Sequence, residues 1–297
     1  MAARRVLMVE PVGFRSNPET AADNAFQEPV PEGEEAAVAE KAQDEFDRLR
    51  EALEERGVEV EVLAPADAST PDAVFPNNWF TTRDGTLILY PMRSPARRRE
   101  RRPEFVESLK ERYPEVVDLS AEEGMGRFLE GTGSLVIDEG AKRVYAAASA
   151  RTDPGLVERW AKRFGYEPVM FAAFDRDGIE IYHTNVVMSV GERWAVSCGE
   201  AIAETVDRSE VLASLFETGH ETFEISLEQM HDFCGNVLEV ENGEGEKLIV
   251  MSERAYEAYT PEQRAVLERH AGIVHVDLST IERHGGGSAR CMLAELN

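Results

Sequence analysis

One layout recurs five times along this chain at nearly constant spacing. Each copy has a short polar cluster, an apolar stretch typical of a strand and a turn, and most copies add a second apolar stretch. The strands are expected to begin near Asn78, Gly133, Asn185, Asn236 and Cys291, which lie 55, 52, 51 and 55 residues apart. A unit of roughly 50 residues with one hairpin and one helix cannot bury its apolar face alone. The spacing therefore predicts a ring of five α/β units around an axis, with the polar clusters meeting at one mouth.

Helical and strand patterns alternate between the polar clusters. Apolar residues recur with helical period over residues 34–57, and Gly57 stands where a helix would end. Strands are expected over residues 6–9 and 58–63. Further helices are expected over residues 104–113, 154–165, 200–217 and 260–271. Hairpin turns are expected over residues 83–85 and 242–246, where Asp84-Gly85 and Asn242-Gly243 are good turn chemistry. The chain has no Gly/Ser-rich linker and no low-complexity tract, which favours a single domain over residues 1–297.

The charge balance excludes several classes of protein. The 297 residues include 32 basic and 57 acidic side chains, a net charge of −25, which repels the phosphate backbone of a nucleic acid. The acidic residues are spread along the chain, as on a solvated surface, and adaptation to a high-salt host is one hypothesis. No apolar run is long enough to span a membrane, and the N-terminus does not read as a secretory signal. Three cysteines cannot form a disulfide framework, so we expect a cytoplasmic protein with no nucleic-acid or membrane partner. The oligomeric state stays open, with a homodimer among the alternatives.

The polar clusters contain the groups that a covalent hydrolase needs. Cys291 follows a glycine-rich run at 284–290, which can bend sharply and lets the backbone approach a ligand. A thiol attacks as the thiolate, and His183, expected at the start of a strand facing the same mouth, is the candidate base. Glu130 could orient substrate or stabilise a positive intermediate. Each has a structural alternative: an inert buried thiol, which we expect for Cys198 and Cys234, a structural histidine, or a turn residue.

The sequence indicates no metal and no cofactor. It has no CxxC, HxxxH or HxH pair, and His231 and Cys234 are close together but lack a second pair. A GxGxxG or Walker pattern, which would bind a nucleotide, is also missing from the sequence.

At this point the motifs resemble those of the pentein fold, a five-bladed α/β propeller of ββαβ repeats with pseudo-fivefold symmetry. This fold is shared by guanidino-group-modifying enzymes such as arginine deiminases, dimethylargininases and amidinotransferases. The resemblance covers essentially the whole chain and rests on residues 71–78, 129–131, 149–152, 183–185 and the glycine-rich run that leads to the cysteine. It implies that Cys291 is the nucleophile, His183 the acid/base and Glu130 the third member of the set. It also implies that Arg151 holds the substrate α-carboxylate.

Two positions depart from the deiminase pattern. Arginine deiminases and dimethylargininases have aspartates that pair with the guanidinium cation where this chain has Asn78 and Asn185. An amide offers both an acceptor and donors, which suits a neutral ureido group, whereas a buried cation without its counter-charge is costly. The two asparagines therefore favour citrulline over arginine.

The same pattern is similar to a branch of citrulline-utilisation hydrolases, as are Asn24 and the NNWF string at 77–80. We therefore expect a hydrolase that converts citrulline to ornithine, carbon dioxide and ammonia, with Asn24, Asn78 and Asn185 orienting the ureido group. The pattern is similar as well to arginine dihydrolases, which are the alternative. Amidino transfer is disfavoured by the two asparagines, and a non-enzymatic pentein binding protein by the complete Cys–His–Glu set. One arginine of a basic run, Arg93, Arg97 or Arg98, is expected to help bind the substrate carboxylate. The alternative is that this run is the solvated start of a helix.

Overall fold

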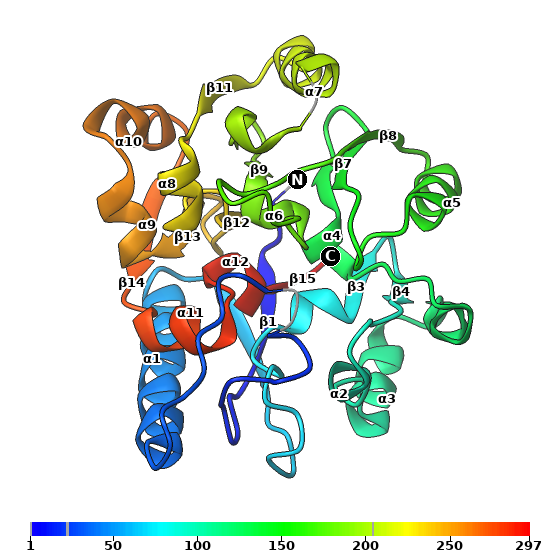
Figure 1. Ribbon diagram of the computed structural model, residues 1–297, viewed down its shortest axis with the longest axis vertical. Coiled ribbons are helices and arrows are strands. Elements are labelled where there is room, and N and C mark those ends of the chain that lie inside the picture. Colours follow the sequence, from blue (N-terminus) through cyan, green and yellow to red (C-terminus); the bar gives the residue numbers. More distant parts are fainter. Residues whose placement is uncertain (1, 22–23, 204) are drawn as a thin grey trace.

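The computed structural model describes residues 2–21, 24–203 and 205–297, and within them the strands form five three-stranded sheets (Figure 1). The sheets contain β15 (Ala294–Leu296), β1 (Arg5–Val9) and β2 (Glu59–Leu63); β3 (Phe80–Arg83), β4 (Thr86–Leu89) and β5 (Glu115–Asp118); β6 (Val136–Asp138), β7 (Arg143–Ala147) and β8 (Glu167–Phe171); β9 (Met188–Val190), β10 (Trp194–Ser197) and β11 (Glu221–Glu224); and β12 (Leu238–Glu241), β13 (Lys247–Ser252) and β14 (Gly272–Val276). The chain colours run around the centre of Figure 1 in order, so consecutive sheets are neighbours in a ring.

All five sheets share one topology. The first strand pairs antiparallel with the second, and the second pairs parallel with a third that returns after helical structure. First strands of neighbouring sheets contact each other, as β6 does with β9 and β15 with β3, so the first strands line the axis. This arrangement confirms the expected ring of ββαβ units, the pentein fold. One unit joins the two ends of the chain, because the C-terminal β15 pairs with the N-terminal β1.

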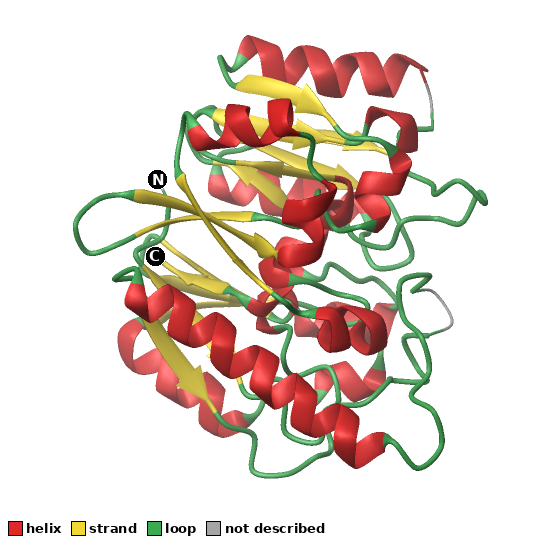
Figure 2. Ribbon diagram, turned by 90° about the vertical axis from the view of Figure 1, so that its left-hand side faces the viewer, coloured by secondary structure: helices red, strands yellow, loops and turns green. Residues whose placement is uncertain are grey.

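Helices cover the outside of the sheets (Figure 2). The longer helices are α1 (Glu35–Glu55), α3 (Pro103–Arg112), α5 (Pro154–Phe164), α7 (Thr205–Glu217) and α10 (Pro261–Glu268). The shorter ones are α2 (Pro95–Arg98), α4 (Gly131–Ser134), α6 (Thr184–Val187), α8 (Leu227–His231), α9 (Glu253–Ala258), α11 (Ser279–Gly285) and α12 (Ala289–Met292), with 3-10 turns η1 (Pro76–Asn78), η2 (Ser120–Met125) and η3 (Gly199–Ala201). No helix in the described part of the chain is long and apolar enough to cross a membrane.

The expected helices are confirmed, with small differences at their ends. Helix α1 buries the stripe that its periodicity predicts, including Phe46 and Leu49, and Gly57 follows it with φ +78°. Between residues 200 and 217 the structure has η3 and then α7; Glu204 lies outside the described residues.

One local expectation was wrong. The polar clusters are not the beginnings of strands: in four units they form single helical turns, η1, α4, α6 and α12, and the strand starts only after the turn. His183 is the N-cap residue of α6, and its side chain makes no cap hydrogen bond but contacts Glu130. The expected turn over residues 242–246 is confirmed as the β12–β13 loop, in which Asn242 Oδ1 accepts the backbone N–H groups of Glu244 and Glu246 and Gly245 takes the positive φ.

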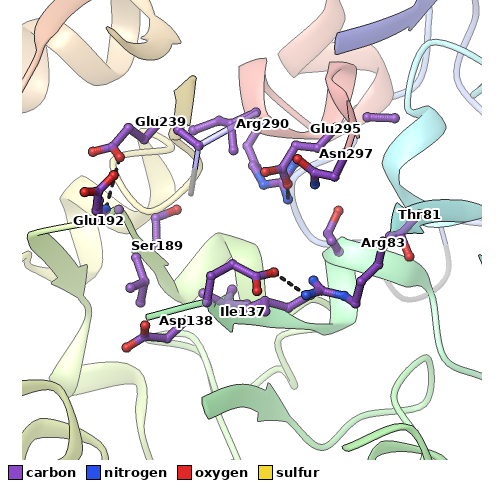
Figure 3. Close-up of a pocket in the computed structure, with 18 of the residues that line it drawn as sticks. Thr81, Arg83, Ile137, Asp138, Ser189, Glu192, Glu239, Arg290, Glu295 and Asn297 are labelled. Atoms are coloured by element: carbon purple, nitrogen blue, oxygen red, sulfur yellow. Dashed lines mark hydrogen bonds and ion pairs between the residues drawn. The ribbon is translucent and has the colours of Figure 1, made fainter. Parts of the chain in front are cut away.

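The first strands also enclose an axial cavity of about 320 Å³ (Figure 3). It lies along the bodies and C-terminal ends of these strands, whereas the polar turns lie at their N-terminal ends. Charged side chains line it: Arg83 pairs with Glu139, and Arg290 donates to Glu295. The axis of the ring is thus polar at both ends.

The Asp84-Gly85 hairpin turn provides a test of the local fold. Both residues have positive φ, +47° and +76°, as a type I′ turn requires, and a Cβ on Gly85 would contact nothing within 4 Å. Gly85→Ala should therefore lower the free energy of unfolding through backbone strain alone, by about 1–2 kcal/mol. Urea unfolding measures this change. Gly124→Ala, which also has open space but an ordinary φ, is the control and should be nearly neutral. Equal effects of the two substitutions would contradict the turn assignment.

Candidate active site

The polar turns of different units meet in one pocket. Of the residues singled out in the sequence, Asn24, Asn78, Arg151, His183 and Cys291 line it directly. The two others are bonded to its lining: Glu130 to His183, and Asn185 to Cys291. The structure therefore brings together all seven side chains, which come from segments up to 267 residues apart between Asn24 and Cys291.

Cys291 lies in the single turn α12 and is 5% exposed. Its Sγ accepts hydrogen bonds from Asn185 Nδ2 at 3.4 Å and from Asn236 Nδ2 at 3.2 Å. The glycines before it have no room for side chains, because a Cβ on Gly286 would lie 2.4 Å from Asn24 Nδ2 and one on Gly287 2.9 Å from the Phe75 ring. The run therefore packs closely against the side chains of Asn24 and Phe75. Burial raises the pKa of the other two thiols, Cys198 to about 11 and Cys234 further.

His183 and Glu130 form a buried pair. Glu130 Oε2 lies 2.9 Å from His183 Nε2, while Glu130 Oε1 accepts the backbone N–H of Arg93 at 2.9 Å. Glu130 therefore orients the imidazole, a question that the sequence left open. The other ring nitrogen, Nδ1, lies over Gly133, where a Cβ would come within 2.7 Å of it.

Burial and nearby arginines set the charge states of this pair. Burial lowers the pKa of His183 to about 4; Glu130 opposes the shift, and Arg151 and Arg97 add to it. Burial alone would raise the pKa of Glu130, but Arg151, the His183 hydrogen bond and Arg97 outweigh it and hold that pKa at about 2. At neutral pH the pair is thus a carboxylate and a neutral imidazole that donates from Nε2. The remaining nitrogen, Nδ1, can accept a proton.

Arg97 fixes the direction of the Asn78 amide. Its Nη1 donates to Asn78 Oδ1 at 2.7 Å, and its Nε and Nη2 donate to the two oxygens of Glu100 at 2.9 and 3.0 Å. A guanidinium can only donate, so the Asn78 atom that faces it must be the oxygen. Asn78 Nδ2 is left buried, with no hydrogen-bond partner among the described residues. Of the three candidate arginines, Arg97 is therefore the one that lines the pocket, while the Arg93 side chain is exposed and Arg98 donates to the carbonyl of Met92.

A second part of the pocket contains opposite charges around Thr20. Arg151 is buried, with its guanidinium over the Tyr182 ring and Nη2 3.4 Å from the Thr20 carbonyl oxygen. Asp72 Oδ2 accepts from Asn17 Nδ2 at 2.8 Å and from Thr20 Oγ1 at 3.4 Å. Its Oδ1 is buried without a hydrogen-bond partner in the described part of the chain, and burial raises its pKa.

Asn24 closes the pocket over the glycine-rich run. Its Nδ2 donates to the Gly285 carbonyl at 3.4 Å and its Oδ1 accepts from the Phe26 backbone N–H at 3.0 Å. Two members of its sequence string, Ala22 and Asp23, lie outside the described residues. The enclosed volume is only about 20 Å³, so the pocket is closed in this conformation.

Sequence reasoning missed three groups of the site. Asp72 stands in the segment 71–78 used for the resemblance, but it was assigned no role, and Asn236 was identified only as the beginning of a strand. No motif in the sequence pointed to Glu100, the partner of Arg97. Among the described residues there is no group of three or more His, Cys, Asp or Glu side chains that could hold a metal ion.

Acid should destabilise the protein through His183. Between its ordinary pKa of 6.5 and about 4, the unfolded chain binds a proton that the folded chain excludes, so the free energy of unfolding falls as the pH falls. His183→Gln does not titrate and should flatten the decline between about pH 7 and about pH 5, measured by urea unfolding. His275→Gln, at an exposed position, is the control. A decline as steep in His183→Gln as in the unsubstituted protein would contradict the assignment.

Comparison with known proteins identifies the family of the chain. Residues 10–297 match the family model described as N,N dimethylarginine dimethylhydrolase, eukaryotic. The sequence has no match among curated proteins. One similar solved structure is the substrate-bound N-terminal domain of ArgZ, an arginine dihydrolase from the ornithine-ammonia cycle in cyanobacteria, with a TM-score of 0.77, 16% identity, and coverage of 98% of this chain and 97% of that one.

Two further structures extend the comparison. Full-length ArgZ without ligand has a TM-score of 0.76 and 17% identity over 98% of this chain, which spans only 40% of that longer protein. A dimethylarginine dimethylaminohydrolase, as its adduct with 4-chloro-2-hydroxymethylpyridine, has a TM-score of 0.70 and 17% identity over 100% of both chains. At such identities the structures show a shared fold, and the family model covers nearly the whole chain. The chain therefore belongs to the N,N-dimethylarginine dimethylhydrolase family, within the pentein-fold superfamily of guanidino-group-modifying hydrolases.

Proposed function

We propose that this hydrolase acts on citrulline and releases ornithine, carbon dioxide and ammonia, with Cys291 as nucleophile. The observation that carries the proposal is the direction of the Asn78 amide. Because Arg97 occupies Oδ1, Asn78 offers the pocket an N–H donor. A ureido oxygen can accept that hydrogen bond, whereas a guanidinium has donors only.

Asn185 complements Asn78. Its Nδ2 donates to Cys291 Sγ, and its Oδ1 is buried without a hydrogen-bond partner among the described residues. That oxygen suits an N–H of the substrate. A donor and an acceptor beside the nucleophile match the C=O and NH₂ of a ureido group. Glu130, the carboxylate that could have paired with a cation here, is already bonded to His183 and the Arg93 backbone.

The amino-acid end of the substrate fits the region around Thr20. We assign its α-carboxylate to Arg151 and its α-ammonium to the free Oδ1 of Asp72. Both groups contact Thr20, so they can hold the two charges of one α-amino acid. Since a pocket of about 20 Å³ is smaller than an amino acid, its lining must open when substrate enters.

The reaction then follows from the charge states. Neutral His183 takes the Cys291 proton, and the sulfur attacks the ureido carbon, forming an S–C bond. The C–N bond to the ornithine side chain breaks, and the imidazolium protonates the departing nitrogen. Water attacks the thiocarbamoyl group while His183 takes its proton, and the thiolate leaves. The released carbamic acid gives carbon dioxide and ammonia. We also propose a cytoplasmic location, in keeping with three unpaired cysteines.

A product assay on purified protein tests the substrate. Citrulline, arginine and dimethylarginine are offered separately, and ornithine, citrulline and ammonia are quantified. We expect ornithine and ammonia from citrulline alone, and none from Cys291→Ala. Ornithine with two ammonias from arginine would make the protein an arginine dihydrolase, as ArgZ is. Citrulline accumulating from arginine or dimethylarginine would overturn the argument from Asn78.

Asn78→Asp tests the donor directly. The carboxylate keeps the bond from Arg97 but cannot donate to a ureido oxygen, so kcat/KM for citrulline should fall roughly 10²-fold or more. The kcat/KM for arginine, whatever its starting value, should fall less, because a carboxylate accepts hydrogen bonds from a guanidinium. Gln43→Glu makes the same amide-to-carboxylate change on the outer helix α1 and should leave both rates unchanged. An equal loss for both substrates in Asn78→Asp would contradict the proposed selectivity.

A further inference from the structure

The side chain of Asn236 hydrogen-bonds to the segments that carry the proposed reaction. It is fully buried and follows the turn after α8. Its Nδ2 donates to the Asn185 backbone oxygen at 3.1 Å and to Cys291 Sγ at 3.2 Å. Its Oδ1 accepts the backbone N–H of Arg290 at 3.1 Å. One carboxamide thus connects the α6 turn, the sulfur and the residue before it.

The bonds at the sulfur favour its anionic form. The amide nitrogens of Asn185 and Asn236 can only donate, and both are directed at Sγ. A donor is bound more strongly by a thiolate than by a neutral thiol, so each one stabilises the charged state. If Asn236 only fixed the backbone, the bonds to Asn185 and Arg290 would be sufficient. Its second amide hydrogen is instead directed at the sulfur.

The bond to Arg290 fixes where the sulfur lies. Helix α12 is a single turn, and the backbone N–H of Arg290 lies at its start, where no earlier turn supplies an acceptor. Asn236 Oδ1 accepts it, while the Arg290 side chain donates to the Leu293 carbonyl and to Glu295 from the axial cavity. The turn is therefore held on both sides, and Cys291 projects into the pocket between them.

We propose that Asn236 is a catalytic residue that positions Cys291 and, with Asn185, stabilises its thiolate. The inference rests on the proposed function only in taking Cys291 as the nucleophile; it does not depend on which substrate is bound.

Other charged and titratable groups also surround the sulfur. Those on the elements packed around it are Asp72, Arg97, Arg151, Tyr182, His183 and Arg290, together with Glu282, which accepts a hydrogen bond from Ser288. The side-chain hydrogen bonds of Asn236 among the described residues go to the Asn185 backbone, the sulfur and the Arg290 backbone, and not to any of these charged side chains. Substituting Asn236 should therefore change the sulfur without directly removing any of these charges.

The test is the pH dependence of iodoacetamide alkylation at Cys291, followed by peptide mass spectrometry, which needs no substrate. Asn236→Asp keeps the acceptor for Arg290 but replaces the donor at the sulfur with a carboxylate. The pH midpoint of alkylation should rise by roughly one unit or more, as expected for a like charge at this distance. Asn236→Ala, which removes the donor without adding charge, should shift the midpoint in the same direction by less. The kcat of Asn236→Asp should fall at neutral pH and partly recover at higher pH.

Asn242→Ala is the matched control. Asn242 is a second asparagine in the same unit, at the far end of β12, and its removal loses turn bonds without touching the sulfur. It should lower the melting temperature and leave the alkylation midpoint unchanged. Alkylation of the buried Cys198 and Cys234 reports unfolding in any variant.

The outcomes separate this inference from the proposed function. An unchanged midpoint in a folded Asn236→Asp or Asn236→Ala variant would overturn the role of Asn236, whatever the product assay gives. A shifted midpoint with no turnover of citrulline would support it and reject only the substrate. If Asn236→Asp does not fold, Asn236→Ala decides the matter by the same readout.

Discussion

The site depends on the pairing of the last strand with the first. Arg5 faces Leu296 and Leu7 faces Ala294 across the antiparallel β1–β15 ladder, which completes the sheet built from the two ends of the chain. That sheet closes the ring, and the turn before β15 carries Cys291. This contact helps to fix the proposed nucleophile relative to His183, which lies two units earlier around the ring. The chemistry therefore depends on a contact of very large sequence separation.

Around the axis, the single helical turns direct polar groups toward one pocket, which strands could not do. A strand side chain alternates between faces, whereas a short turn can point its polar side chains and its backbone N–H groups into one space. Glycines allow these turns to approach, since a Cβ on Gly131 would lie 2.2 Å from the Asn77 carbonyl oxygen and one on Gly235 2.2 Å from that of Val186. The small residues that look unremarkable in the sequence set how closely neighbouring units pack.

Buried charge in the pocket is balanced in two places. Glu130 orients His183 and faces Arg151, burial keeps the imidazole neutral, and Glu100 supports Arg97. Asp72 has a buried oxygen without a hydrogen-bond partner in the described part of the chain, and the proposal assigns it to the amino-acid end of the substrate. The side chains that donate hydrogen bonds to the sulfur are amides. A neutral reacting group is the natural match for such a surface.

The sequence by itself predicted the ring and identified the candidate site residues. The repeat of 51 to 55 residues predicted five units, and Cys291, His183 and Glu130 could be chosen because their residue types and motifs point to covalent hydrolysis. Only the tertiary structure decided in which direction each asparagine amide points. An asparagine has a donor and an acceptor on one side chain, and neighbours from distant segments choose which one faces the substrate, as Arg97 does for Asn78. Asn236 could not be assigned for the same reason: its role exists only where three segments far apart in the chain meet.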